Sequence, residues 1–172
     1  MSKPLSQLEV LNGYAEKARE GLMHCCSSTR WVEAMLAQRP FRDPKHVYDC
    51  AAICWQRLAR ADWLEAFSQH PRIGDLRGAR SLDDTERTWA EGEQSGAARA
   101  AESVRLALAE GNREYERKFG HVFIVCATGK SGEEMLALLR QRLNHPPEAE
   151  LAIAAAEEEK ITRIRLEKLL SQ

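Results

Sequence analysis

The sequence predicts an all-α protein with one helical domain spanning residues 1–172. Apolar residues recur at helical spacing along most of the chain, and capping residues or prolines stand where these stretches begin and end. One apolar segment has a strand-like composition, but no obvious second strand is present to pair with it. At 172 residues the chain is long enough to bury a substantial core in a single domain.

The first helix boundaries lie close to the N-terminus. Ser6 and Glu9 have the spacing of a capping box, which opens a first short helix. Asn12-Gly13 interrupts this helix, and a second helical stretch runs to about Cys26. A short stretch with an apolar face, Trp31–Gln38, then ends before a proline.

Asp43-Pro44 is the next helix start, because an N-capping aspartate precedes a proline at the first helical position. Residues 70–84 beyond this region are predicted to form a loop that contains glycines and several charges. Between the two, apolar residues keep helical spacing up to His70: Val47, Ala51, Cys54, Leu58, Leu64 and Phe67.

The second half of the chain is predicted to be mostly helical as well. Residues 85–110 form an alanine-rich helix, and residues 112–119 add another turn or two. Ser131 and the glutamate three residues after it repeat the capping-box spacing. Pro146-Pro147 ends the helix that this box opens and starts a final long helix to about Leu170.

The segment VFIVCA, residues 122–127, departs from this pattern. It is a continuous apolar run rich in β-branched residues, so periodicity does not distinguish a strand from a buried helix. The predicted fold is therefore a helical bundle with a short irregular apolar segment near residues 122–128.

Charge and composition exclude some classes of partner. The net charge is −1, with acidic and basic residues interleaved, so no overall field attracts nucleic acid or an anionic membrane. No apolar run approaches the roughly 18 residues of a membrane span.

The five cysteines predict a reduced, cytoplasmic protein, because their number is odd and no secretory signal peptide precedes them. Cys50 and Cys54 are spaced like half of a zinc site, but no matching second pair of ligands is evident. Buried thiols are the better interpretation of this pair.

The stretch FIVCATGKS resembles the end of a phosphate-binding P-loop, which would make the protein a nucleotide binder acting through Lys130. A P-loop requires a glycine five residues before Gly129, and Ile124 stands there instead. The alternative interpretation is a buried segment, a turn at Gly129 and a helix cap at Ser131.

HPRIGD, residues 70–75, places a histidine at a helix end directly before a proline. The proline fixes the backbone of His70 in an extended conformation. Histidine is suited to general acid–base catalysis near neutral pH, although a structural role is the simpler explanation for one histidine alone. The arginines that follow in this loop are interpreted as solvated residues.

Glu93 and Gln94 begin the alanine-rich helix, where a carboxylate is favoured by the helix dipole. In a functional site the glutamate could orient a histidine. The glutamine amide could both donate to and accept from a urea or imide.

Two arginines near the C-terminus differ in their helical neighbours. Arg163 has glutamates four residues before and after it, as in a surface residue that forms ion pairs. Arg165 has Ile161 and Leu169 at those positions, so it lies on or beside the apolar face. A partly buried arginine requires an anion or carbonyl groups, and Glu158 near the same face is one candidate partner.

These motifs together resemble the 2-oxo-4-hydroxy-4-carboxy-5-ureidoimidazoline (OHCU) decarboxylases of urate degradation. The resemblance covers nearly the whole chain, and no single short motif carries it. It includes RWVEAMLAQRPF at 30–41, HPRIGD at 70–75, EQSG at 93–96, KFGHVFIVCATGKS at 118–131 and KITRIRLEKLL at 160–170.

The resemblance implies an all-α fold, no metal or organic cofactor, and a homodimer. It implies His70, Glu93 and Arg165 as catalytic residues. It also implies a set of substrate-binding residues: Pro71, Ala90, Gln94, Phe123, Ile124, Val125, Cys126 and Ala127.

The implied reaction is decarboxylation of OHCU, a small-molecule substrate, to (S)-allantoin, with His70 as general acid or base and Arg165 gripping the substrate. Two other functions remain open at this point. A non-enzymatic helical adaptor would use the same bundle and tolerate changes at these positions, and a P-loop-like protein would bind ATP.

Overall fold

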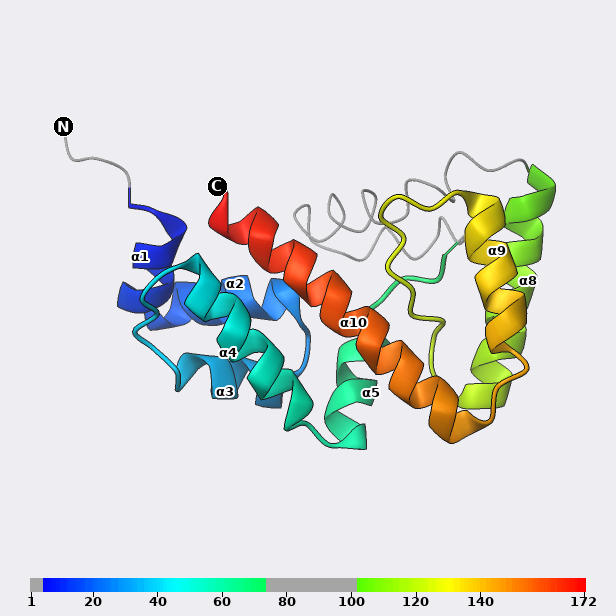
Figure 1. Cartoon of the computed structure of the whole chain (residues 1–172), viewed down its shortest axis with the longest axis horizontal. Helices are drawn as coiled ribbons and strands as arrows, with labels where there is room; N and C mark the ends of the chain where they lie inside the picture. Colours follow the sequence, from blue (N-terminus) through cyan, green and yellow to red (C-terminus); the bar gives the residue numbers. More distant parts are fainter. Residues whose placement is uncertain (1–4, 74–101) are drawn as a thin grey trace. The chain divides into compact units, whose positions relative to one another are not determined.

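The computed structural model describes residues 5–73 and 102–172 of the chain. The described residues form eight helices and no strand, which confirms the predicted all-α fold (Figure 1). The helices are α1 (Gln7–Gly13), α2 (Ala15–Cys25), α3 (Thr29–Leu36), α4 (Pro44–Gln56), α5 (Arg60–Ser68), α8 (Glu102–Phe119), α9 (Gly132–Arg142) and α10 (Pro147–Leu170).

The chain divides into two compact units. The first unit comprises residues 1–66 and 159–172, and the second comprises residues 67–158. Helix α10 is continuous across this division. The prediction of a single domain over the whole chain stays a prediction.

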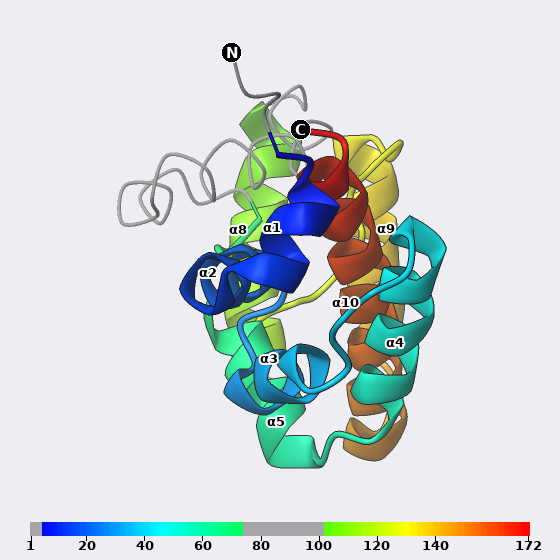
Figure 2. The same cartoon turned by 90° about the vertical axis from the view of Figure 1, so that its left-hand side faces the viewer.

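The first unit packs α1 to α4 with the C-terminal part of α10 (Figure 2). The side chains of Leu22, Trp31, Met35 and Leu166 are fully buried at its centre. Gly21 on α2 lies close to α10, because a Cβ built there would stand 3.5 Å from the Leu169 side chain.

The predicted helix starts in this unit follow from local capping chemistry. Ser6 and Glu9 form both hydrogen bonds of a capping box, and the Asp43 side chain accepts the amide of His46 at 2.7 Å. Helix α3 begins at Thr29, earlier than predicted, because the Ser28 side chain caps it. The helical spacing that extends to Phe67 also conceals a break, since α4 ends at Gln56 and α5 begins at Arg60.

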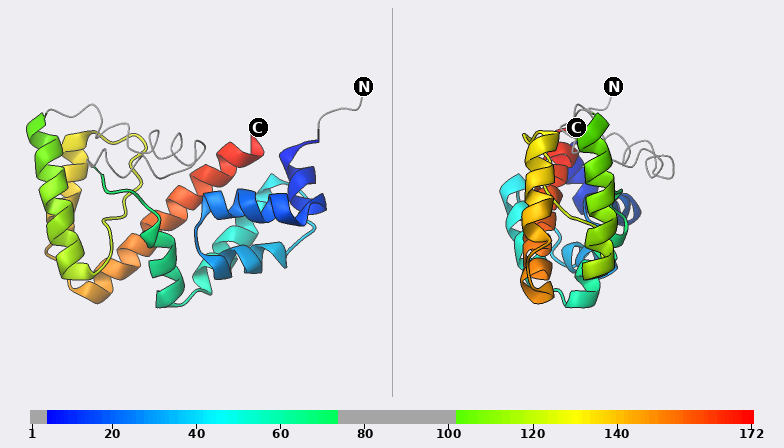
Figure 3. Two further views of the ribbon diagram at one scale, coloured as in Figure 1. Left: turned by 180° about the vertical axis from the view of Figure 1, so that it is seen from behind. Right: turned by 90° about the vertical axis from the view of Figure 1, so that its right-hand side faces the viewer.

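In the second unit α8 and α9 lie side by side and run in the same direction (Figure 3). Their close approach requires Gly111, where a Cβ would stand 2.6 Å from Leu139 Cδ2. Helix α8 runs without interruption through Asn112, so residues 102–119 form one helix rather than two separate pieces. The fully buried Leu108, Tyr115 and Met135 belong to the core of this unit.

Residues 122–127 lie in the connection that leads from the end of α8 back to the start of α9, and they form neither a helix nor a strand (Figure 1). The five residues from Phe123 to Ala127 are all buried. Side chains supply partners for part of this backbone: Arg142 donates to the Ile124 carbonyl at 2.7 Å, and Glu157 accepts the Cys126 amide at 2.8 Å. A buried backbone outside regular structure requires such partners, so the segment remains irregular without a neighbouring strand.

Candidate active site

His70 follows the end of α5 and precedes Pro71, as its sequence context predicted. Its backbone amide donates to the Phe67 carbonyl at 3.1 Å, which closes the last turn of the helix. Its side chain is only 10% exposed, and the ring Nε2 lies 2.7 Å from Oε2 of Glu158 on α10. The imidazole is therefore held beside a carboxylate.

Helix α8 fixes the residues that follow the histidine. The guanidinium of Arg72 makes two contacts with the carboxylate of Glu116, at 2.5 and 2.8 Å. The buried Asn112 donates its side-chain amide to the Ile73 carbonyl at 3.1 Å. Arg72 is half exposed, as expected for a solvated loop residue, and its ion pair also ties the segment that carries His70 to α8.

Glu158 is a residue whose role the sequence analysis did not identify. Its carboxylate is completely buried, and the only ion pair that it makes within the described residues is with His70. Neither oxygen makes a hydrogen bond to another described residue, so the 2.7 Å contact lies off the hydrogen-bonding direction. The sequence analysis offered Glu158 as a candidate partner for Arg165, but within the described residues it contacts His70 instead.

Adjacent positions on α10 connect the histidine with the apolar segment. Glu157 accepts the backbone amide of Cys126, and Glu158 contacts His70. The structure therefore brings His70 and the segment at 123–127 to the same turn of α10, within the second unit.

The backbone of the apolar segment is only partly engaged. The amide of Cys126 is occupied by Glu157, and its carbonyl accepts the Lys130 ammonium at 2.8 Å. No hydrogen bond joins the amides of Ile124, Val125 or Ala127 to another of the described residues.

A buried ionic cluster supports this segment from the other side. Arg142 on α9 is 5% exposed and donates to Glu150 at 2.7 Å, to Ile124 and to the Tyr115 hydroxyl at 3.3 Å. Its guanidinium also lies 4.6 Å from the centre of the Phe123 ring. The Tyr115 hydroxyl donates to Glu150, and the pKa of Tyr115 is strongly raised by burial and by this bond. His145 also contacts Glu150, at 2.9 Å. We call these four side chains the Arg142 cluster: Arg142, Glu150, Tyr115 and His145.

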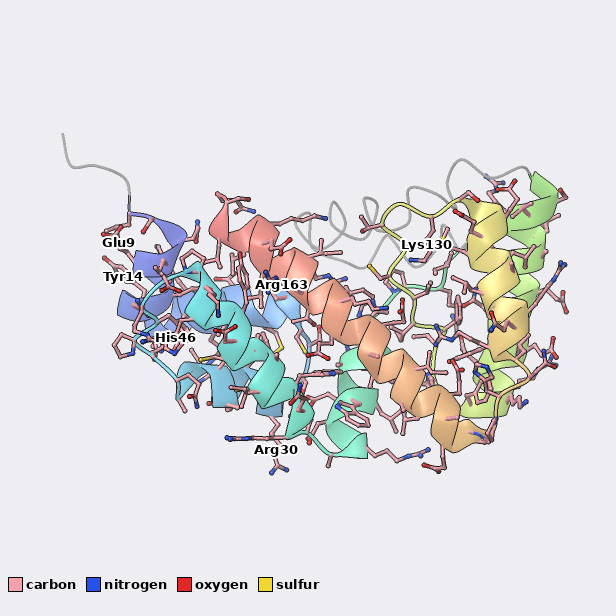
Figure 4. All side chains as sticks on the ribbon, in the orientation of Figure 1. Glu9, Tyr14, Arg30, His46, Lys130 and Arg163 are labelled. Atoms are coloured by element: carbon pink, nitrogen blue, oxygen red, sulfur yellow. The ribbon has the colours of Figure 1, made fainter. Side chains whose placement is uncertain are left out.

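The two C-terminal arginines lie on different faces of α10, as predicted. Arg163 is exposed, donates to Glu167 at 2.7 Å and stacks on the Tyr48 ring at 3.7 Å (Figure 4). Arg165 is 9% exposed, and its guanidinium makes a long 3.5 Å contact with the His24 carbonyl. Both belong to the first unit.

Lys130 and Ser131 follow the structural interpretation of the FIVCATGKS stretch. The Lys130 ammonium bonds to the Cys126 carbonyl (Figure 4), Gly129 forms a turn at φ 78°, and Ser131 caps α9 with a complete capping box. In a P-loop the lysine would have to reach the phosphates instead.

Three of the predicted site residues, Ala90, Glu93 and Gln94, lie outside the described residues. Over residues 5–73 and 102–172 no three His, Cys, Asp or Glu side chains are grouped as a metal site. All five cysteines are free and buried, and burial raises the pKa of Cys50 and Cys54. None of the described helices is long and apolar enough to cross a membrane.

Comparison with known proteins relates this geometry to a family. The family model for OHCU decarboxylase matches residues 14–167. The chain is 37% identical over 147 residues to the uric acid degradation bifunctional protein TTL of Arabidopsis thaliana. The matched region covers 86% of this chain and 45% of that protein. The chain is 32% identical to a putative OHCU decarboxylase of Homo sapiens, over 80% of this chain and 79% of that protein.

Solved structures that are similar to this one include the following two. A crystal structure of OHCU decarboxylase in the presence of (S)-allantoin has a TM-score of 0.75 and 34% identity, and the match covers 93% of this chain and 100% of that chain. A crystal structure of (S)-allantoin synthase has a TM-score of 0.68 at 19% identity, over 96% of this chain and 54% of that chain, and shows the shared fold. The chain spans less than half the length of the plant relative. The chain belongs to the OHCU decarboxylase family.

Proposed function

We propose that this protein catalyses decarboxylation of OHCU to (S)-allantoin without a metal or organic cofactor. The observation that carries the proposal is a buried imidazole, His70, beside a carboxylate on α10, next to an apolar segment with unengaged backbone amides. Family membership supplies the substrate class, because relatives are named for this reaction.

In the proposed reaction the bond between the ring carbon and the carboxylate breaks, and CO₂ leaves. The electron pair moves into the adjacent imine-like centre of the ring, which acts as the electron sink. The neighbouring ring carbon, which bears the ureido group, then takes up a proton on one face. The hydroxyl on the decarboxylated carbon loses its proton and becomes a ring carbonyl, which gives a single enantiomer of allantoin. Because the substrate supplies its own sink, no pyridoxal or thiamine group is required.

His70 exchanges protons with the substrate hydroxyl or the reacting carbon in this scheme. Glu93 positions the histidine and sets its protonation, and Gln94 holds the ureido group. Pro71, Ala90 and the segment Phe123 to Ala127 contact the substrate, and the amides that are free of other partners donate to ring oxygens.

Arg165 grips a substrate oxygen with its planar guanidinium, which offers two parallel donors. Its burial supports this assignment, since a buried guanidinium is suited to an anionic or carbonyl partner. We further propose a cytoplasmic homodimer as the working form.

The test is conversion of freshly prepared OHCU by purified protein, followed as optically active allantoin by circular dichroism. His70→Asn keeps polarity and approximate size but cannot exchange the proton near neutral pH. We expect kcat to fall by roughly 10²–10⁴-fold while substrate binding persists.

Protein treated with a chelator and dialysed should keep its activity. A loss of activity that added metal restores would refute the cofactor-free mechanism. A wild-type protein that does not accelerate the conversion at all would leave the helical adaptor as the better description.

A further inference from the structure

We infer that Glu158 is a positioning residue for His70: it holds the proton on Nε2, so that Nδ1 is the nitrogen that exchanges protons with the substrate. The role in turnover rests on the proposed function. The pairing of the two side chains rests on the geometry alone.

The carboxylate of Glu158 is buried at an energetic cost. Its side chain is 0% exposed and lies on the long helix α10, yet neither carboxylate oxygen makes a hydrogen bond within the described part of the chain. A buried carboxylate without hydrogen bonds is costly, and the imidazole beside it carries no charge when neutral, so a neutral group of the same size at this position should not lower stability. Glu158 is therefore not explained by stability.

The group that Glu158 contacts is a ring nitrogen of His70. Nε2 of His70 lies 2.7 Å from Oε2, within hydrogen-bond distance but off its direction. Catalytic hydrogen bonds are often poorly aligned before a ligand binds and improve in the complex. A modest rotation of the imidazole would bring its Nε2–H group into line with the carboxylate.

The Glu158 carboxylate favours one tautomer of His70. A carboxylate only accepts hydrogen bonds, so it favours a ring that carries its proton on Nε2. In the neutral ring Nδ1 then holds the lone pair and acts as the base. When Nδ1 takes a proton from the substrate, the resulting imidazolium lies directly beside the Glu158 carboxylate, which stabilises its positive charge.

The neighbouring charged groups have contacts of their own. Arg72 is paired with Glu116 on α8, and the Glu157 carboxylate accepts the Cys126 amide. Each of these contacts holds a neighbouring segment, and Glu158 is the carboxylate among the described residues that contacts the His70 ring.

The kinetic test compares Glu158→Gln with Glu159→Gln, a matched change at the next position of the same helix. We expect Glu158→Gln to lower kcat by roughly 10- to 100-fold with little change in KM. Loss of a carboxylate that orients a metal-bound histidine has an effect of this size in metalloenzymes. Its melting temperature should be equal to or above that of the wild type. Glu159→Gln should match the wild type in both measurements.

The second test reads the histidine directly. Nitrogen-15 NMR of the ring, at a pH where the ring is neutral, distinguishes a proton on Nε2 from one on Nδ1. The wild type should carry the proton on Nε2. Glu158→Gln should show a mixture, because an amide can either accept from or donate to the ring nitrogen.

The outcomes separate this inference from the proposed function. An active wild type whose rate is unaffected by Glu158→Gln, or a ring protonated on Nδ1, overturns the role of Glu158 and leaves the decarboxylase intact. A ring protonated on Nε2 in a protein that does not act on OHCU supports the pairing and overturns the proposed reaction. A fall in kcat that tracks a lower melting temperature reduces Glu158 to a structural residue.

Discussion

Replacement of Arg142 by methionine should strongly destabilise the second unit. The change removes a buried guanidinium that donates to Glu150, to the Ile124 carbonyl and to the Tyr115 hydroxyl. Glu150 is 0% exposed, so its carboxylate would lose its guanidinium partner in a dry environment. Breaking a buried ion pair by removing one partner typically costs about 3–5 kcal/mol.

Equilibrium unfolding in urea, followed by far-UV circular dichroism, measures this cost. For a chain of this length about 3–5 kcal/mol corresponds to a fall in melting temperature of roughly 6–20 °C. Arg140→Met is the matched control, since Arg140 lies on the exposed side of the same helix turn. We expect it to change the free energy of unfolding by no more than about 0.5 kcal/mol.

A double-mutant cycle with Glu150→Gln tests the reason for the loss. If the uncompensated charge of Glu150 dominates, neutralising it should make the double variant more stable than the sum of the two single effects implies, by roughly 0.5–3 kcal/mol. A loss below about 1 kcal/mol for Arg142→Met, or strictly additive effects in the cycle, would refute this reasoning.

Two further predictions follow from the remaining charged and polar groups. Arg165→Lys keeps the charge but loses the paired donors, so KM for OHCU should rise and kcat should fall. Arg163→Lys should change neither constant. The ion pair of Arg163 with Glu167 is half exposed, and such a pair is worth about 0–1 kcal/mol. Equal damage from the two changes, in proteins that melt at the wild-type temperature, would place the wrong arginine in the site. Tyr115 stays neutral in the folded protein above the ordinary phenol pKa of 10.0, whereas in the unfolded chain it ionises there. The free energy of unfolding of the wild type should therefore fall as pH rises past that value. We expect it to fall by about 1.4 kcal/mol per pH unit more than that of Tyr115→Phe. Urea unfolding at several alkaline pH values measures the difference, and parallel curves for the two proteins would contradict it.

The parts of the fold that could be predicted are those set by local chemistry. The capping boxes at Ser6 and Ser131 and the Asp43-Pro44 start depend on residues within one turn, so their positions follow directly from the sequence. The break between α4 and α5 was missed because apolar spacing continues across it. There the Asp62 side chain accepts the Ala59 amide at 2.8 Å.

The site was predictable only in part, since its important contacts join distant segments. His70 could be identified because proline and helix-end signals surround it. Its pairing with Glu158 could not, because periodicity places a residue on a helix face without specifying what packs there. Arg142 resembled an ordinary basic residue in the last turn of a helix, and its burial depends on Glu150 beyond the following proline turn.

The irregular route of residues 122–127 also bears on aggregation. Short apolar runs rich in β-branched residues stack readily into intermolecular sheets when their backbone is exposed. Here the segment is buried, and part of its backbone is bonded to the side chains of Arg142, Glu157 and Lys130 rather than to another strand. Lys118 and Lys130 lie a few residues beyond its two ends, and such charged residues oppose stacking of an apolar run. Loss of the Arg142 cluster would therefore release a segment suited to self-association, so the same contacts that shape the site protect the protein from forming intermolecular sheets.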